Sequence, residues 1–377
     1  MNRRTIPVAA PVFAGNEKKY VNDCLDSTWI SSAGMYIHAF EEKFADFCEV
    51  KHAISVMNGT VALHLSMLVL GIGPGDEVII PTFTYVATAN CVTYVGAIPV
   101  FVDSEPQTWN IDAGKIEQAI TPHTKAIIVV HIYGHPANMD PIMDIAHRHN
   151  LYVIEDAAEA HGAQVNERPV GSIGHIATFS FFGNKILTAG EGGMIVTNNT
   201  EMAQKMRQLK GQGVDPDRRY WFPVVGYNYR MTNIQAAIGL AQLEKVDWHL
   251  AQRRRIAQTY YESLRGVDGI TLQPELPGYV NSYWMTSLLL DEKLPKRDWV
   301  MLQLAKYGIE TRPFFYPMHV LPMYEHLSQG QNFPIANRVS AQGMSLPSSA
   351  NLTEDDIWYV CESLVKVLCS PSGNHPS

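Results

Sequence analysis

Two or three carboxylates follow directly after an apolar run and are the first candidates for chemistry. Residues 153–162 read Val-Ile-Glu-Asp-Ala-Ala-Glu-Ala-His-Gly. In open α/β sheets, ligands bind beyond the carboxyl ends of the strands. A carboxylate there could keep a heteroaromatic nitrogen protonated through an ion pair. Asp156 is the first to emerge, although it could equally be an ordinary carboxylate in the first turn of a helix.

A lysine follows a second apolar run in the same manner. Residues 180–185 read Ser-Phe-Phe-Gly-Asn-Lys, and the glycine-rich run Gly-Glu-Gly-Gly occupies 190–193. Burial without a partner lowers the pKa of a lysine, which suits an amine that forms a Schiff base. An exposed loop lysine is the simpler interpretation. The glycines favour the ligand role for Lys185, because glycine lets the backbone approach a ligand closely.

The start of a helix supplies a candidate phosphate site. Asn58-Gly59-Thr60 directly precedes the apolar run 61–70, and the free N–H groups of a helix start attract anions. A plain helix cap is the alternative. Tyr85, after another strand, could stack on a planar ring or simply pack in the core. An acid, a lysine, a phosphate cradle and an aromatic lid together match the needs of pyridoxal phosphate.

The elements that must position these residues are a series of short β-branched runs. Apolar runs that do not alternate and are separated by helices predict a mostly parallel sheet covered on both faces. Helices are expected at 61–70 and 139–149, and Thr232 with Gln235 forms a capping box for a helical run reaching about residue 264. The expected strands are 77–80, 98–102, 126–131, 152–155, 177–181 and 193–197.

A smaller α+β domain is expected from about residue 245 onward. A chain of 377 residues predicts two or three domains. The proposed division is a large α/β domain over 1–244 and a smaller domain over 245–377, with a frayed tail from about 370. In the smaller domain, strands are expected at 270–277, 283–290 and 310–314, and helices at 297–307 and 353–367.

Composition excludes several classes of protein. The formal net charge of −8 is spread without blocks, which argues against a nucleic-acid partner. Each apolar run is well short of the roughly 20 residues that span a bilayer, and the N-terminus lacks the apolar core of a signal peptide. A cytoplasmic protein with no membrane partner is expected. Five cysteines without a Cys-x-x-Cys pair, and histidines without suitable spacing, predict no metal site.

Four motifs in this order resemble those of the DegT-type family of pyridoxal-phosphate-dependent nucleotide-sugar aminotransferases. They are 155–162, 180–185, Gly-Glu-Gly-Gly-Met at 190–194 and Gly-Tyr-Asn-Tyr-Arg-Met at 226–231, and the resemblance runs from Pro7 to about Val367. It implies the aspartate-aminotransferase-like fold, fold type I. That fold has a mostly parallel central sheet flanked by helices and a smaller C-terminal α+β domain.

The resemblance also implies a role for each matching residue. Lys185 would bond to the cofactor and move the proton, Asp156 would pair with the pyridine nitrogen, and Glu159 would lie near the ring hydroxyl. These three are the expected catalytic residues. Tyr85 would stack on the ring, while the phosphate would be bound by Gly59, Thr60 and Ser180, joined by Asn228 from a second subunit. The active site would then be shared within a homodimer.

The run over 211–223 is similar to a subgroup acting on GDP-4-keto-6-deoxymannose, with L-glutamate as amino donor and C4 as the aminated carbon, in polysaccharide synthesis. The segment 311–319 is expected to line the sugar pocket. Candidate substrate-binding residues are Arg218, Arg219, Tyr220, Arg230, Tyr316 and His319. Two alternatives stay open: an aminotransferase for another 4-keto or 3-keto sugar linked to dTDP or UDP, or a non-catalytic regulator that binds pyridoxal phosphate.

Overall fold

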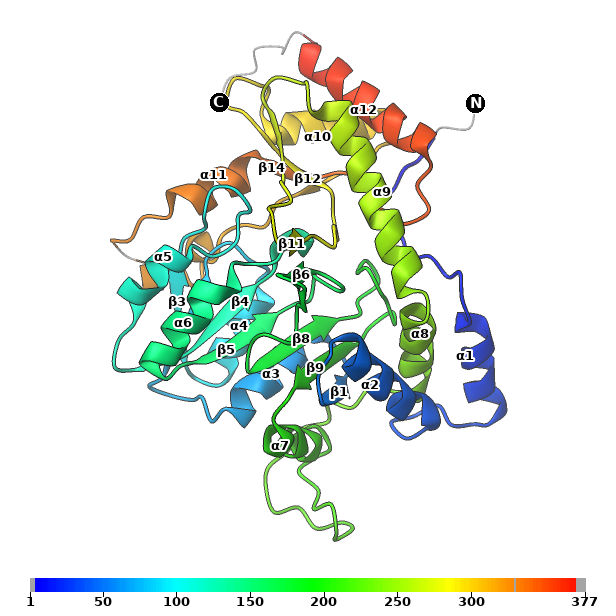
Figure 1. Cartoon of the computed structure of the whole chain (residues 1–377), viewed down its shortest axis with the longest axis vertical. Coiled ribbons are helices and arrows are strands. Elements are labelled where there is room, and N and C mark those ends of the chain that lie inside the picture. Colours follow the sequence, from blue (N-terminus) through cyan, green and yellow to red (C-terminus); the bar gives the residue numbers. More distant parts are fainter. Residues whose placement is uncertain (1–3, 329, 371–377) are drawn as a thin grey trace.

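A seven-stranded sheet forms the centre of the protein (Figure 1). The computed structural model describes residues 4–328 and 330–370, so the expected frayed tail lies largely outside the described residues. The strand order is β1-β9-β8-β5-β4-β2-β3. The strands are β1 (His52–Val56), β2 (Glu77–Pro81), β3 (Ile98–Val102), β4 (Thr124–Val130), β5 (Tyr152–Asp156), β8 (Ile176–Ser180) and β9 (Gly193–Thr197).

The prediction of a mostly parallel sheet is confirmed. Strands β3, β2, β4, β5 and β8 pair in parallel, and only β9 is antiparallel to its neighbours β8 and β1. The carboxyl ends of the parallel strands therefore meet at one edge. The strands are mostly apolar because helices cover both faces. The helices of this part are α1 (Glu17–Asp26), α2 (Met35–Phe47), α3 (Gly59–Val69), α4 (Ala87–Tyr94), α5 (Ala113–Ile116), α6 (Met139–His149), α7 (Thr200–Lys210) and α8 (Asn233–Leu243).

The single long helix expected from Thr232 to about Leu264 is wrong, because the structure has two helices there. The capping box is present: the Thr232 hydroxyl accepts from the Gln235 N–H, and the Gln235 amide oxygen accepts from the Thr232 N–H. Helix α8 ends at Leu243 and α9 (Val246–Leu264) begins after the non-helical Lys245. The chain must turn there, since α8 packs against α1 and α2 whereas α9 packs against α12 (Glu354–Cys369).

A second sheet of four antiparallel strands lies in the C-terminal part. It is covered by α9, α10 (Arg297–Lys306) and α12, and α11 (Pro334–Gln342) lies nearby. The strand order is β10 (Ile270–Leu272), β12 (Ser287–Leu290), β14 (Gly343–Ser345) and β13 (Arg312–Pro313). The expected strands are therefore present but shorter, and β14 was missed. The proposed domain boundary at residue 244 stays a prediction.

The beginning of the chain packs with this C-terminal part. Ile6 is buried in the same core as α9, α10 and α12, and it pairs with Ile309. Its N–H donates to the Gly308 carbonyl, and the Ser348 N–H donates to the Val8 carbonyl, each at 2.9 Å. The two ends of the described chain thus share one core.

Smaller elements connect the two sheets. A three-stranded sheet contains β11 (Tyr279–Val280), β6 (Gln164–Val165) and β7 (Arg168–Pro169). Short 3₁₀ helices lie at Glu117–Ala119, Ile132–Gly134, Met318–Val320 and Glu325–Ser328. Within residues 4–328 and 330–370, no helix combines the length and apolar character needed to cross a bilayer. The expected cytoplasmic location stays a prediction.

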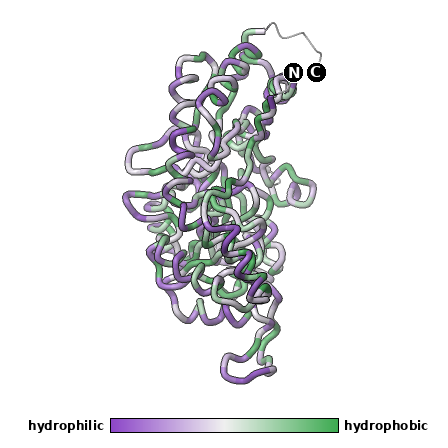
Figure 2. The backbone as a smooth tube through the Cα atoms, turned by 90° about the vertical axis from the view of Figure 1, so that its right-hand side faces the viewer, coloured by the Kyte–Doolittle hydropathy of each residue, from purple (hydrophilic) through white to green (hydrophobic). Residues whose placement is uncertain are grey.

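Residues 211–230, between α7 and α8, form a long loop that we call the arm. Figures 1 and 2 show it extending away from the rest of the chain in two perpendicular views. Its base is closed by hydrogen bonds, including Gln212 N–H to the Tyr227 carbonyl at 2.9 Å. Gly213 and Gly226 cross so closely that a Cβ on either would lie about 2 Å from the opposite backbone. The arm therefore leaves the body through a fixed, narrow base.

Candidate active site

A cavity of about 330 Å³ opens at the carboxyl edge of the large sheet. Several parallel strands end there and helix α3 begins there, as expected for ligand sites in α/β folds. The structure brings together seven of the predicted site residues in its wall: Gly59, Thr60, Tyr85, Asp156, Glu159, Ser180 and Lys185.

Asp156 is the last residue of β5 and lies buried at the floor of the cavity. Thr88 Oγ1, from α4, donates to Asp156 Oδ2 at 2.8 Å, and the Ala158 N–H donates to Oδ1 at 3.3 Å. Burial raises the pKa of this carboxyl, since the low-dielectric surroundings disfavour its charged form. A cation in the cavity would offset this effect.

Lys185 and Glu159 face each other across the cavity. Lys185 Nζ lies 3.7 Å from Glu159 Oε1; the Glu159 side chain is buried, and that of Lys185 is 12% exposed. Burial lowers the pKa of the Lys185 amine and raises the pKa of Glu159 to about 7. The Tyr133 N–H donates to Glu159 Oε2 at 2.8 Å and fixes that carboxyl. A lysine with a lowered pKa supplies a neutral amine at a pH nearer neutrality than a free lysine does.

The N-terminus of α3 forms the anion-binding end of the cavity. Asn58 caps this helix, because its Oδ1 accepts from the Val61 N–H at 3.0 Å. A Cβ on Gly59 would lie 3.0 Å from the Ser180 Cβ, and a Cβ on Gly193 would lie 2.4 Å from the Asn58 carbonyl oxygen. Side chains are excluded at both glycines, so the strand ends and the helix start pack backbone to backbone. The N–H groups of a helix start attract anions.

Sequence reasoning missed several residues in the wall or in contact with it. Thr88 holds Asp156, and Trp284 lies against Lys185, with Nζ 3.9 Å from the centre of its ring. Arg312 and Phe315 reach the cavity from the C-terminal part. Arg312 and Phe315 belong to the expected pocket segment 311–319 without having been singled out. No local pattern distinguished Thr88 or Trp284.

The predicted substrate-binding residues do not line the cavity of their own chain. Arg218 stacks on Trp221 and Arg219 on Tyr220 within the exposed arm. Asn228 lies at the base of the arm, paired with Gly211.

The other three predicted contacts also lie outside the cavity wall. His319 is bonded to Thr82 Oγ1 at 2.7 Å and to Asn337 Oδ1 at 2.9 Å, and Tyr316 is exposed. Arg230 is half-buried. For these residues a ligand contact stays a prediction.

Comparisons with known proteins agree with this arrangement. Residues 12–365 match the DegT/DnrJ/EryC1/StrS aminotransferase family. The chain is 56% identical over 366 residues to GDP-perosamine synthase of Caulobacter vibrioides, covering 96% of this chain and 98% of that protein. It is 49% identical over 360 residues to GDP-perosamine synthase of Vibrio cholerae, covering 95% and 98%. A sugar aminotransferase from Streptococcus pneumoniae in its PLP form superposes with a TM-score of 0.91 at 28% identity, covering 97% and 98%.

Proposed function

This chain belongs to the DegT/DnrJ/EryC1/StrS aminotransferase family, and we propose that it transfers an amino group from L-glutamate to C4 of GDP-4-keto-6-deoxymannose. The products would be 2-oxoglutarate and GDP-perosamine, an amino sugar nucleotide used in O-antigen synthesis. The observation that carries the proposal is the single cavity containing Lys185, Asp156 and the first turn of α3. The identity to two GDP-perosamine synthases supports the choice of substrate.

The cavity fits pyridoxal phosphate as the cofactor. This molecule requires an amine for its aldehyde, a carboxylate for its ring nitrogen and an anion site for its phosphate. The first turn of α3 and Ser180 line the same cavity, and the N–H groups of a helix start attract anions. Asp156 would hold the ring nitrogen, Lys185 would bond to the aldehyde carbon and Tyr85 would cover the ring. The phosphate would be held by Gly59, Thr60 and Ser180. When bound, the cofactor supplies an electron sink for the carbon that loses a proton.

In the reaction, the protein's own side chains transfer a proton and hold charged groups in position. Lys185 is the general acid and base, because its amine lies in the cavity and its pKa is lowered by burial. Asp156 is held by Thr88 and Ala158, so its carboxylate is oriented before any ligand arrives. A cationic ring nitrogen would reverse the raised pKa of Asp156 and keep it ionised. Glu159, fixed by Tyr133, would accept from the ring hydroxyl.

The arm is the proposed contact for the nucleotide. Among the described residues, neither Arg218 nor Arg219 has a carboxylate within ion-pair distance. Guanidinium groups bind phosphates through paired, charge-assisted hydrogen bonds. The diphosphate of a sugar nucleotide would therefore provide the missing counter-charge. A dTDP- or UDP-linked keto sugar would satisfy the same groups and is the alternative substrate.

In a homodimer, the arm of one subunit would reach the cavity of the other subunit. The arm extends away from the rest of its own chain, as Figures 1 and 2 show, and none of its residues lines the cavity described above. Its side chains are unusually apolar for an exposed loop: Tyr220 is 74% exposed and Val225 is 88% exposed. Exposed apolar surface of this kind favours a protein partner. In the proposed dimer, Asn228 of each subunit completes the phosphate site of the other.

The deciding experiment supplies the protein with pyridoxal phosphate and glutamate and offers GDP-, dTDP- and UDP-linked 4-keto sugars in turn. We expect 2-oxoglutarate release to be fastest with the GDP sugar. If only a dTDP- or UDP-linked sugar were turned over, the proposed substrate would be wrong and the proposed transamination would still hold. Cofactor binding without turnover of any sugar would favour the alternative that the protein is a non-catalytic regulator.

The attachment point is tested separately. Borohydride reduction followed by peptide mass mapping should place the cofactor on Lys185, with the buried, ion-paired Lys210 as the internal comparison. An adduct on another lysine would contradict the proposed mechanism.

A further inference from the structure

Trp284 forms a wall of the cavity that nothing in the proposed reaction yet uses. Its indole ring is 3% exposed, and Lys185 Nζ lies 3.9 Å from the ring centre. The indole Nε1–H donates to the carbonyl oxygen of Asn184 at 2.8 Å. Asn184 directly precedes Lys185, so the ring is tied to the backbone that carries the lysine.

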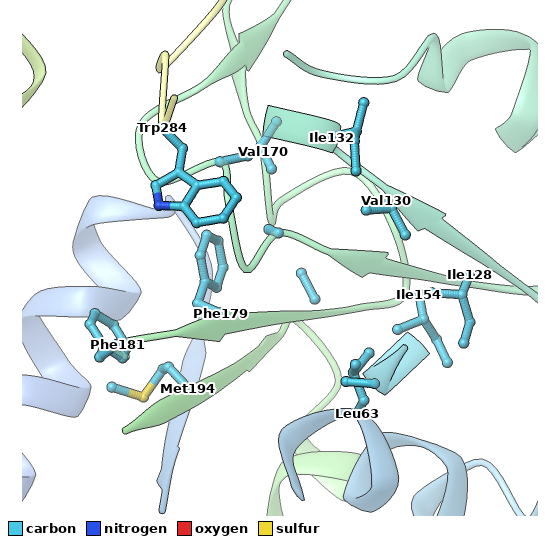
Figure 3. Close-up of a cluster of buried hydrophobic side chains, with 14 of the residues drawn as sticks. Leu63, Ile128, Val130, Ile132, Ile154, Val170, Phe179, Phe181, Met194 and Trp284 are labelled. Atoms are coloured by element: carbon cyan, nitrogen blue, oxygen red, sulfur yellow. The ribbon is translucent and has the colours of Figure 1, made fainter. Parts of the chain in front are cut away.

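The position of this ring is fixed from the other side as well. Trp284 stacks on Tyr133 with an interplanar angle of 12°, and Tyr133 in turn stacks on Phe314 at 4.5 Å. Gly134 packs closely against the backbone of this residue, since a Cβ on it would lie 2.7 Å from the Trp284 backbone nitrogen. Figure 3 shows the indole ring reaching from the C-terminal part into the apolar cluster that contains Val170 and Phe179.

The same stack also reaches the carboxylate opposite the lysine. The Tyr133 N–H donates to Glu159 Oε2, so Trp284 and Tyr133 together contact both members of the Lys185–Glu159 pair. The other charged or titratable groups that influence Lys185 are Asp156, His161 and Arg312. Among the described residues, only the Glu159 carboxylate lies within ion-pair distance of Nζ. The indole face is therefore the second close contact of the ammonium.

The face of an indole ring attracts a cation and has no comparable attraction for a neutral amine. A fixed ring at this distance thus favours the protonated amine and restricts where it lies. Burial acts in the opposite direction, because it favours the neutral form. We propose that Trp284 is a positioning residue for Lys185, whose indole face holds the free amine in place and helps retain its proton. Its part in turnover rests on the proposed function, whereas the contact itself does not.

The test uses the cofactor-free protein and needs no turnover. Lys185 is labelled with fluorodinitrobenzene over a range of pH, and the labelled peptide is quantified by mass spectrometry. The midpoint of the pH profile reports the charge of the amine, and the plateau at high pH reports its accessibility. In Trp284→Leu we expect the midpoint to move to lower pH and labelling at pH 7 to rise about three- to tenfold after correction for the plateau. Trp284→Phe, which keeps an aromatic face, should restore the wild-type rate to within about twofold.

Trp109 provides the matched control. It is fully buried and contacts the same stack through Phe314 at 5.2 Å. Trp109→Leu should lower the melting temperature without moving the Lys185 midpoint. An unchanged midpoint in Trp284→Leu, or an equal shift in Trp109→Leu, would overturn the proposal and leave Trp284 as packing alone.

Fluorinated tryptophan keeps the proposal testable if Trp284→Leu does not fold. Tetrafluorotryptophan retains the ring shape and weakens the negative potential of its face. Its incorporation should lower the midpoint in the wild type and leave it unchanged in Trp284→Phe. An equal change of the labelling midpoint in the wild type and in Trp284→Phe would contradict the role of the ring face. A failure of the sugar assay would leave each of these results intact, so the two proposals fail independently.

Discussion

The cavity and the arm are built in opposite ways, although family resemblance assigns ligand contacts to both. In the cavity, Asp156 and Glu159 are buried and already held by Thr88 and Tyr133. On the arm, Arg218 and Arg219 lie in an exposed loop and contact mainly their aromatic neighbours. The groups for proton transfer are thus organised within one chain. The groups assigned to the nucleotide have little to hold them until a substrate or a second copy is present.

Removal of the cavity amine should have the largest effect. Lys185→Ala should lower turnover by at least about 10⁴-fold, because it deletes both the attachment point and the proton carrier. The measurement is 2-oxoglutarate release at saturating glutamate and sugar. Lys205→Ala, which removes a side chain bonded to the Val69 carbonyl, is the control and should stay near wild type. Activity above a tenth of wild type in Lys185→Ala would mean that the reaction does not take place in this cavity.

Neutralising the buried acid tests the electrostatic part of the same site. Asp156→Asn can keep the Thr88 hydrogen bond but cannot form an ion pair with a ring cation. We expect turnover to fall about 10²- to 10³-fold, with little change in melting temperature. Asp140→Asn, at an exposed residue, serves as the control. An Asp156→Asn enzyme with normal turnover would show that the charge is unnecessary.

Glu159 should make the stability of the cofactor-free protein depend on pH. A carboxyl whose pKa is raised on folding, here from 4.5 to about 7, stabilises the folded state fully below its unfolded pKa. That contribution is lost as the pH rises through the folded pKa. Between pH 4.5 and 7 the wild type should therefore lose about 2–3 kcal/mol that Glu159→Gln retains. Urea unfolding at several pH values measures this difference, with Glu325→Gln as an exposed control. If the free energy of unfolding of wild type and of Glu159→Gln changed equally with pH, the prediction would be refuted.

The arm can be tested by mixing subunits. Asn228→Ala should weaken cofactor binding about 10- to 100-fold, since a hydrogen bond to a charged phosphate is lost. Unfolding and refolding Lys185→Ala together with Asn228→Ala should restore about a quarter of wild-type turnover at limiting cofactor. Half of the dimers are then mixed, and each contains one intact site. No recovery above the separate variants would place Asn228 in the site of its own chain or in none.

The arm arginines should show the smallest effect. Arg218→Ala and Arg219→Ala should each raise the KM for the nucleotide sugar about three- to tenfold, with kcat and the glutamate KM nearly unchanged, because exposed ion pairs are weak. Arg148→Ala removes an exposed arginine that is paired with Glu117 and is the matched control. An effect on the glutamate KM would place these residues at the donor side instead.

Most of the large sheet could be predicted from sequence because its strands are short apolar runs that end in polar or glycine-rich turns; the edge strand β1 was not predicted. β5 and β8 were found in this way, and Asp156 and Lys185 with them. The C-terminal strands β11 and β13 are only two residues long, and their pairing depends on tertiary neighbours. Helices α8 and α9 were merged because the break at Lys245 reflects what each packs against and not a helix-breaking residue.

The site was predictable to the extent that local sequence defines it. Gly59, Asp156 and Lys185 each follow or precede a periodic element, so their location in one ligand site could be inferred from position. Trp284 and Arg312 reach the cavity from the C-terminal part. Resemblance placed Arg312 in the expected pocket segment 311–319 without singling it out, whereas no nearby pattern indicates Trp284. Asn228 came from resemblance alone.

The shared core of the two chain ends has a consequence for synthesis. Ile6 and Val8 leave the ribosome long before their hydrogen-bond partners Gly308 and Ser348. At about 5–20 residues per second, this segment waits roughly 15–60 s for its partners. The C-terminal core cannot be completed until residues 308–348 have been made, so loss of residues 4–10 would destabilise a part of the protein that is synthesised much later.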